Sequence, residues 1–125
     1  MTVRFRRNPI ERDDFGNVLD FEKTWVCFTM TVKNAPDERA ATDAFDFIEW
    51  YLCEQADTPC ALLRCAKCEN GIYNDALTFE RDKSMRKDVQ YQVLKDLLRE
   101  AKAAWYKELA SAIPPFILAA TRKSA

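Results

Sequence analysis

Apolar and polar positions alternate most clearly between residues 18 and 33, in the segment VLDFEKTWVCFTMTVK. From residue 26 to residue 32, every second side chain is large and apolar: Val26, Phe28, Met30 and Val32. A period of two, built from β-branched and aromatic residues, is typical of a half-buried strand. The shorter run TVRFRR, residues 2–7, has a similar character, and we predict that the two segments pair as antiparallel strands.

After residue 33 the apolar period changes from two to three or four. The apolar positions that recur at this spacing are Ala41, Ala44, Phe45, Ile48 and Leu52. This spacing places them on one face of a helix. Asn34 is a candidate N-cap, and Pro36 is tolerated in a first helical turn, so we predict a helix that begins near these residues.

The predicted helix is strongly acidic. Seven Asp and Glu residues and a single base, Arg39, occur between Asp37 and Asp57, which gives a local net charge of -6. The candidate partner-binding residues are Asp43, Asp46, Glu49, Trp50 and Asp57. A row of carboxylates can face a basic protein surface in the manner of a nucleic-acid mimic. The alternative is a solvated helix face, which the near-neutral charge of the whole chain favours.

The segment PCALLRCAKCENG, residues 59–71, fits two structures. As a helix it has Thr58 as its cap, Pro59 at its first position, several good helix formers and Gly71 as a stop. As a strand it would lead through a hairpin turn at Asn70 and Gly71 into IYNDALTF. Because start, stop and propensity agree, we predict a short helix. The strand alternative gives the order βαββαβ, which resembles the ferredoxin-like fold.

The helical spacing of apolar residues predicts that residues 83–113 form the longest helix, which Pro114 and Pro115 terminate. Its apolar side chains form two adjacent rows, Val89, Val93, Leu97 and Leu94, Leu98, Ala101, Trp105, Leu109. Such a helix would be about 45 Å long, which is longer than a domain of this size usually spans. We therefore expect part of it to project from the domain or to pair with another chain, and the candidate self-association residues are Leu94, Leu98 and Trp105.

These elements predict an α+β domain in which an N-terminal antiparallel β element packs against two or three helices, the last one long. The chain has 125 residues, of which 48% are hydrophobic, and this length can bury one core. We expect residues 1–125 to form a single domain with a mobile tail at residues 121–125.

The net charge, the lengths of the apolar runs and the number of cysteines indicate which partners and which cellular compartment to expect. Nineteen Lys and Arg against twenty Asp and Glu leave a net charge of -1, so no global field attracts nucleic acid or an anionic membrane. No apolar run approaches the roughly 20 residues of a membrane span, and an odd number of cysteines fits a reducing compartment. We expect a cytoplasmic protein without membrane contact, and direct nucleic-acid binding is not expected.

The chain has no histidine and only two glycines. Histidine is the usual general base and the usual partner of Ser and Cys nucleophiles. Phosphate-binding loops need several glycines at fixed spacing. We therefore expect neither enzyme activity nor a nucleotide cofactor.

Four of the five cysteines lie close together in the sequence, at Cys53, Cys60, Cys65 and Cys68. Four thiolates can hold zinc in a tetrahedral structural site. Only one pair has the C-x-x-C form, and the segment between the cysteines is shorter than in a zinc ribbon or finger. Buried reduced thiols are the favoured interpretation, and a zinc module is the alternative.

The N-terminal segment is basic, with Arg4, Arg6, Arg7 and Arg12. These side chains can contact phosphates. A solvated edge strand is the favoured interpretation, because arginine on an edge strand also discourages aggregation.

Taken together, the sequence predicts a non-enzymatic interaction protein, an adaptor or inhibitor that occupies a surface of a larger protein complex through its charged helix faces. A complex that handles nucleic acid is one such partner, by way of the acidic helix. The alternatives are a four-cysteine metal-binding module and a self-assembling structural subunit, that is, a homo-oligomer.

Overall fold

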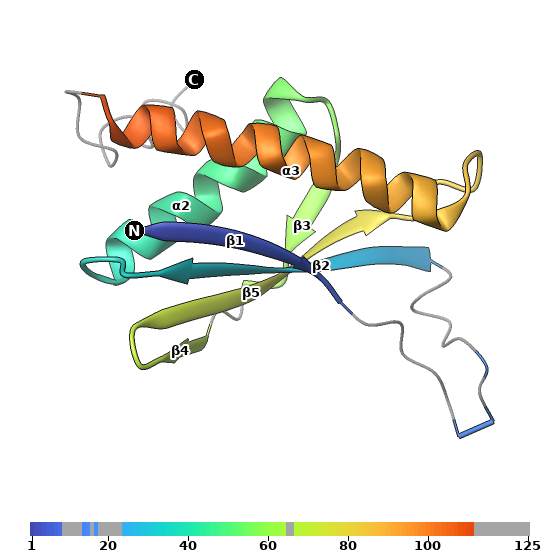
Figure 1. Ribbon diagram of the computed structural model, residues 1–125, viewed down its shortest axis with the longest axis horizontal. Helices are drawn as coiled ribbons and strands as arrows, with labels where there is room; N and C mark the ends of the chain where they lie inside the picture. The colour runs from blue at the N-terminus through green and yellow to red at the C-terminus, as the bar shows by residue number, and fades with distance from the viewer. Residues whose placement is uncertain (9–13, 16, 18–23, 65–66, 112–125) are drawn as a thin grey trace.

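The computed structural model of the chain describes residues 1–8, 14–15, 17, 24–64 and 67–111. Its first half contains strands β1 (Thr2–Arg7) and β2 (Trp25–Lys33), then helix α2 (Glu38–Trp50) and a π-helical turn, η1 (Tyr51–Gln55). Its second half contains strands β3 (Cys60–Leu62), β4 (Lys67–Glu69) and β5 (Ile72–Glu80), then helix α3 (Lys87–Leu109). Figure 1 shows these elements in order along the chain.

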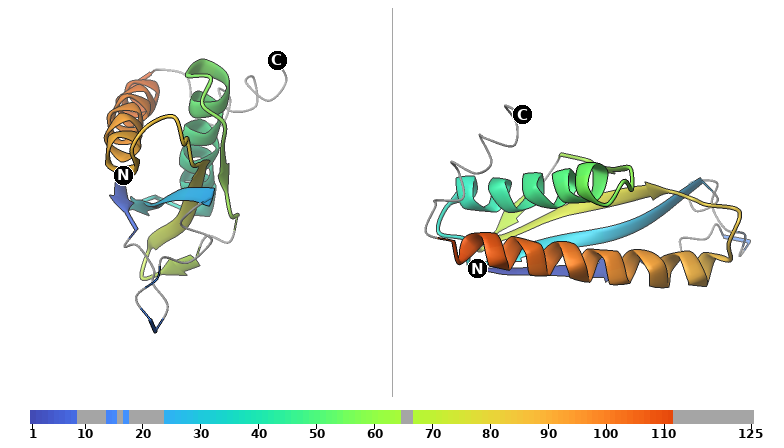
Figure 2. Two further views of the ribbon diagram at one scale, coloured as in Figure 1. Left: turned by 90° about the vertical axis from the view of Figure 1, so that its right-hand side faces the viewer. Right: turned by 90° about the horizontal axis from the view of Figure 1, so that it is seen from above.

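The strands form one antiparallel sheet in the order β1-β2-β5-β3, and β4 also pairs with β5. This order makes β1 an edge strand. Helices α2 and α3 lie side by side on one face of the sheet, with α3 above β1 (Figure 2). The core therefore lies between one sheet face and two helices.

β1 and β2 confirm the predicted antiparallel pair, with Thr2 opposite Lys33 and Arg7 opposite Phe28. The alternating apolar side chains of β2 are all buried, namely Val26, Phe28, Met30 and Val32. Val3 of β1 joins them in the core because it lies opposite Val32. Residues 18–23 of the predicted strand lie outside the described residues.

Helix α2 confirms the predicted helix, and its apolar face is buried as expected. The prediction of Asn34 as the N-cap is wrong, because Asp37 caps the helix by accepting a hydrogen bond from the Ala40 N–H at 2.8 Å. Asn34 has a φ of 58°, a left-handed conformation that asparagine tolerates, and it lies just after β2. A capping oxygen must reach an N–H two or three residues ahead, and Asp37 meets this condition.

The prediction of a short helix at residues 59–71 is wrong, and the segment forms strands, as in the alternative. β3 pairs with residues 77–79 of β5 and β4 pairs with residues 72–74, so β3 and β4 are two halves of one interrupted strand. Asn70 and Gly71 join β4 to β5 with φ values of 54° and 75°. A two-residue type I′ hairpin turn requires positive φ at both positions. Pairing with β5 thus outweighs the local helix propensity of the segment.

The chain order also differs from the ferredoxin-like βαββαβ alternative. Two strands precede the first helix, and α3 is the last described element. When β3 and β4 are counted as one interrupted strand, the described elements follow the order ββα twice. The predicted α+β class is confirmed, with an antiparallel sheet, two helices and a long last helix.

Helix α3 confirms the long C-terminal helix but is shorter than the predicted residues 83–113. It buries one row of side chains against the rest of the core, Leu94, Leu98, Ala101 and Trp105. Val89 and Val93, from the second predicted row, are 45% and 51% exposed. Within the described residues, no helix is long and apolar enough to cross a membrane. The predicted mobile tail, residues 121–125, lies outside the described residues.

Candidate functional site

A groove of about 520 Å³ lies between the edge strand β1 and helix α3. Its apolar lining comes from Phe5, Phe28, Tyr91 and Leu98. The charged residues that line it are Arg6, Arg7, Lys95, Arg99, Lys102 and Asp88. Because side chains alternate along β1 and Val3 and Arg7 face the helices, the Arg6 side chain lies on the opposite face of the sheet. We call the cleft the basic groove and define it by its other four cations, Arg7, Lys95, Arg99 and Lys102.

Helical periodicity places three of the cations on α3. Lys95, Arg99 and Lys102 are spaced by four and three residues, so they share one face of the helix. This face lies beside the buried row that contains Leu98, which itself lines the groove. The three side chains therefore border the groove along about two turns of α3.

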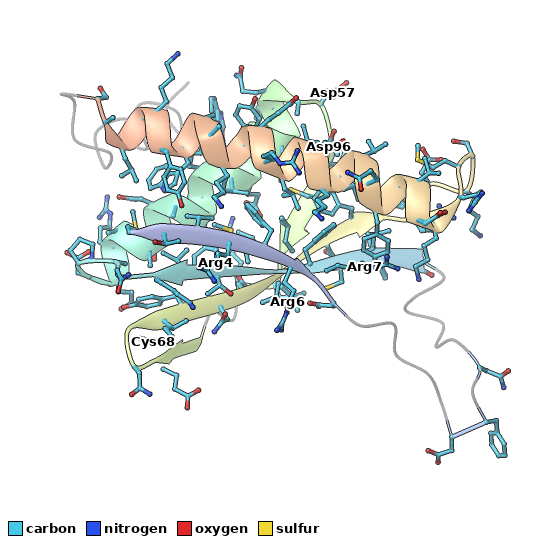
Figure 3. All side chains as sticks on the ribbon, in the orientation of Figure 1. Arg4, Arg6, Arg7, Asp57, Cys68 and Asp96 are labelled. Atoms are coloured by element: carbon cyan, nitrogen blue, oxygen red, sulfur yellow. The ribbon has the colours of Figure 1, made fainter. Side chains whose placement is uncertain are left out.

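β1 supplies the fourth cation, Arg7. Figure 3 shows Arg6 of the same strand projecting from the sheet away from α3. The Arg7 guanidinium carbon lies 3.6 Å from the centroid of the Tyr91 ring of α3. A cation over an aromatic face at this distance is attracted by the ring, which holds Arg7 in the groove.

Two carboxylates of the predicted acidic face are paired within the fold. The Arg64 guanidinium bonds the Asp46 carboxylate at 3.0 Å and also bonds Glu49. The hydrogen bond with Asp46 is the main cause that raises the pKa of Arg64 above its usual value. Glu49 also accepts a hydrogen bond from the Leu62 N–H at 3.1 Å. Asp46 and Glu49 therefore hold β3 and the residues after it against α2.

The other three predicted partner-binding residues lie apart from one another. Asp43 is 5% exposed and forms an ion pair with Arg39 at 3.5 Å. Trp50 is half-buried, and its ring centroid lies 5.6 Å from that of Phe47. Asp57 is exposed in the segment after η1, on the far side of α3 from β1 in Figure 3. The five predicted residues therefore do not form one continuous acidic surface.

The three predicted self-association residues lie in the core. Leu94, Leu98 and Trp105 are buried, and they pack with the apolar side chains of the sheet and of α2. Buried side chains offer no surface to a second chain. The large apolar side chains that α3 exposes are Val89 and Val93.

The structure brings together two of the four predicted metal-binding cysteines. The sulfur atoms of Cys53 in η1 and Cys60 in β3 are 3.7 Å apart. β3 and β4 pair with opposite ends of β5, which separates Cys60 and Cys68 by about 20 Å along the sheet. Cys65 lies outside the described residues. Among the described residues, no group of three or more His, Cys, Asp or Glu side chains could hold a metal ion.

We expect Cys53 and Cys60 to form a disulfide when the folded protein is treated with oxidised glutathione, because their sulfur atoms are already in contact. Each disulfide releases two molecules of reduced glutathione, and the intact mass of the protein falls by about 2 Da. Burial, followed by the neighbouring Cys53, raises the pKa of the Cys60 thiol, so the reaction should quicken as the pH rises. An unchanged mass, or the same loss in Cys53→Ser, would contradict this pairing.

The basic groove is not predicted by the residue pattern of the sequence. One signal was present, since Lys95, Arg99 and Lys102 have the spacing of a single helix face. Acidic residues of the same helix, including Asp88 in the groove lining and Asp96 beside Arg99, conceal that row when the charges are only counted. The contribution of Arg7 depends on the position of β1 below α3, which the sequence alone does not define.

Comparisons with protein-family models, with curated proteins and with solved structures found no significant match to this chain.

Proposed function

We propose that this chain is a non-enzymatic interaction protein that binds an acidic segment of a larger protein partner in the basic groove. The observation that carries the proposal is the convergence of four cations, Arg7 of β1 and three on α3, around one apolar cleft. Cations held together repel one another, and an acidic ligand relieves that repulsion. A cytoplasmic adaptor or inhibitor would act in this way, by occupying a surface of its partner.

An acidic protein segment suits the groove better than a nucleic acid does. Nucleic-acid binding draws most of its affinity from many phosphate contacts, whereas the whole chain has a net charge of -1. Exposed carboxylates at Asp88, Asp96 and Glu100 interrupt the cations on α3, so the basic surface is short and suits a few acidic side chains better than a continuous phosphate backbone. The apolar lining at Phe5 and Leu98 can receive aliphatic side chains of a peptide.

The test is the affinity of the purified protein for fluorescein-labelled polyglutamate, measured by fluorescence anisotropy. Wild-type protein should bind. The double variant Lys95→Glu with Arg99→Glu should bind roughly tenfold to hundredfold more weakly, because each change replaces an attraction by a repulsion. Both positions are exposed, and the ion pair of Arg99 with Asp96 at 3.6 Å is a surface pair of small energetic value, so the fold should persist.

The matched control is Lys83→Glu with Lys107→Glu, which changes the net charge equally at exposed positions outside the groove. It should bind polyglutamate within about twofold of wild type. An equal loss in both double variants, or a wild-type protein that does not bind polyglutamate, would overturn the proposal. Tighter binding of a labelled single-stranded oligonucleotide, lost in the groove variant, would also overturn it in favour of nucleic acid.

A further inference from the structure

We propose that the acidic segment binds in an extended conformation and adds to the sheet as a new strand on the outer edge of β1. This inference rests on the proposed function and specifies the partner as a strand-forming peptide with acidic residues at alternate positions. Strand addition at an exposed sheet edge is a general mode of peptide recognition, in which main-chain hydrogen bonds give affinity and side chains give specificity.

The backbone of β1 is paired on one side, because the sheet order places this strand at the edge beside β2. In an antiparallel pair, alternate residues direct their N–H and C=O groups toward the partner strand. The Asn8 N–H donates to the Cys27 carbonyl at 3.2 Å, so even-numbered residues of β1 face β2. The backbone groups of Val3, Phe5 and Arg7 therefore point outward.

Tyr106 of α3 already uses the first of these outward positions. The Val3 N–H donates to the Tyr106 hydroxyl oxygen at 2.8 Å. This contact confirms that odd-numbered amides of β1 point away from β2. Phe5 and Arg7 lie further along the strand, where both line the basic groove. Their outward backbone groups are in place to pair with a strand bound there.

The cations of α3 are spaced to match an extended peptide. Lys95 and Arg99 are four residues apart on the helix, which is about 6 Å along its axis. Side chains on the same side of a strand repeat about every 6.6 Å. A peptide strand beside β1 can therefore direct successive acidic side chains toward Lys95 and Arg99.

The charge of β1 selects an acidic strand over a second copy of this chain. Arg4 and Arg6 are exposed on β1. Antiparallel pairing of two β1 strands would bring arginines of both copies close together, and like charges opposite one another are destabilising. The acidic side chains of a bound peptide strand lie on the other face of the sheet, where Lys95 and Arg99 attract them. Charge complementarity therefore favours an acidic peptide, and not a second copy of this chain, as the strand that binds at the edge of β1.

The direct test is amide hydrogen exchange, resolved by NMR, with a peptide that alternates glutamate and valine. In the free protein, the Phe5 and Arg7 amides should exchange quickly, and the Arg4 and Arg6 amides slowly, because the latter bond β2. Saturating peptide should slow exchange at Phe5 and Arg7 by at least roughly tenfold, because a paired amide exchanges only after local opening. Unchanged exchange at both residues in the saturated complex would overturn strand addition.

A pair of variants isolates one backbone donor. Arg7→Ala and Arg7→Pro both remove the side chain, but only proline removes the outward N–H, and no bond to β2 is lost. We expect Arg7→Pro to bind the peptide roughly threefold to tenfold more weakly than Arg7→Ala, which is the effect of one net hydrogen bond. Equal affinities of the two variants would contradict backbone pairing.

A second measurement keeps the protein unchanged and modifies the peptide. A strand pairs with its neighbour through alternate residues, so N-methylation at one alternate set should weaken binding at least roughly tenfold and at the other set by less than about twofold. Binding that survives both modifications but is lost in Lys95→Glu with Arg99→Glu would overturn strand addition and leave the proposed function standing. If the wild-type protein bound neither this peptide nor polyglutamate, both strand addition and the proposed function would be contradicted.

Discussion

Replacing Trp105 by alanine is expected to lower the free energy of unfolding by about 3–5 kcal/mol. The indole is fully buried and is the largest such side chain among the described residues. Its ring centroid lies 5.3 Å from that of Phe47, so it joins α3 to α2. Truncation removes this contact and leaves a cavity that the neighbours fill only partly. Because domains are stable by only about 5–15 kcal/mol, the variant should be close to unfolding.

Urea denaturation followed by circular dichroism measures this effect. The matched control is Trp25→Ala, whose side chain is 39% exposed at the start of β2 and should cost about 1 kcal/mol. Trp105→Phe should cost much less than Trp105→Ala, because Trp105 Nε1 has no hydrogen-bond partner among the described residues and only volume is lost. Equal losses for the two alanine variants would contradict this account of the core.

Replacing Gln90 by alanine is expected to lower the free energy of unfolding by about 2–3 kcal/mol. Gln90 is buried in the first turn of α3, and its Nε2 donates to the Glu80 carbonyl at 2.9 Å. Its Oε1 accepts from the Asp82 N–H at 3.0 Å and from the Arg81 guanidinium at 2.9 Å. Alanine would leave these groups without their partner, and a partly buried polar group without a partner costs more than a net hydrogen bond.

The matched control for Gln90 is Gln92→Ala, two residues further along the helix. Gln92 is exposed and donates to Asp96 on the same helix at 3.0 Å, so its loss should change stability by less than about 0.5 kcal/mol. Chemical denaturation of the two variants gives the comparison. If Gln90→Ala were no more destabilising than Gln92→Ala, the buried amide would not be what fixes the start of α3 on the end of β5.

The elements with one buried face could be predicted from the sequence. Burial of one side imposes a period of two on β2 and a period near 3.6 on α2, and both periods are visible in the residue pattern. The hairpin of β3, β4 and β5 could not be predicted in this way. Ala61 and Leu62 favour a helix by only tenths of a kcal/mol each, whereas strand stability depends on cross-strand neighbours. The Asn70 and Gly71 turn was the local signal for the observed structure.

The candidate site could be predicted only in part. The sequence shows that residues 37–57 are acidic, but the pairing of Asp46 and Glu49 with Arg64 depends on the left-handed turn after β3. The basic groove depends on the sheet order, which places β1 at the edge and below α3. Charge balance over a whole chain does not reveal such segregation, because opposite charges on separate faces cancel in the count.

An NMR titration of isotope-labelled protein with polyglutamate tests the basic groove as the binding site most directly. The proposed function predicts chemical-shift changes that are confined to β1 and to residues 88–102 of α3 and that reach saturation. Changes that cluster on residues 43–57 instead, or a spectrum that stays unchanged at high polyglutamate concentration, would contradict it.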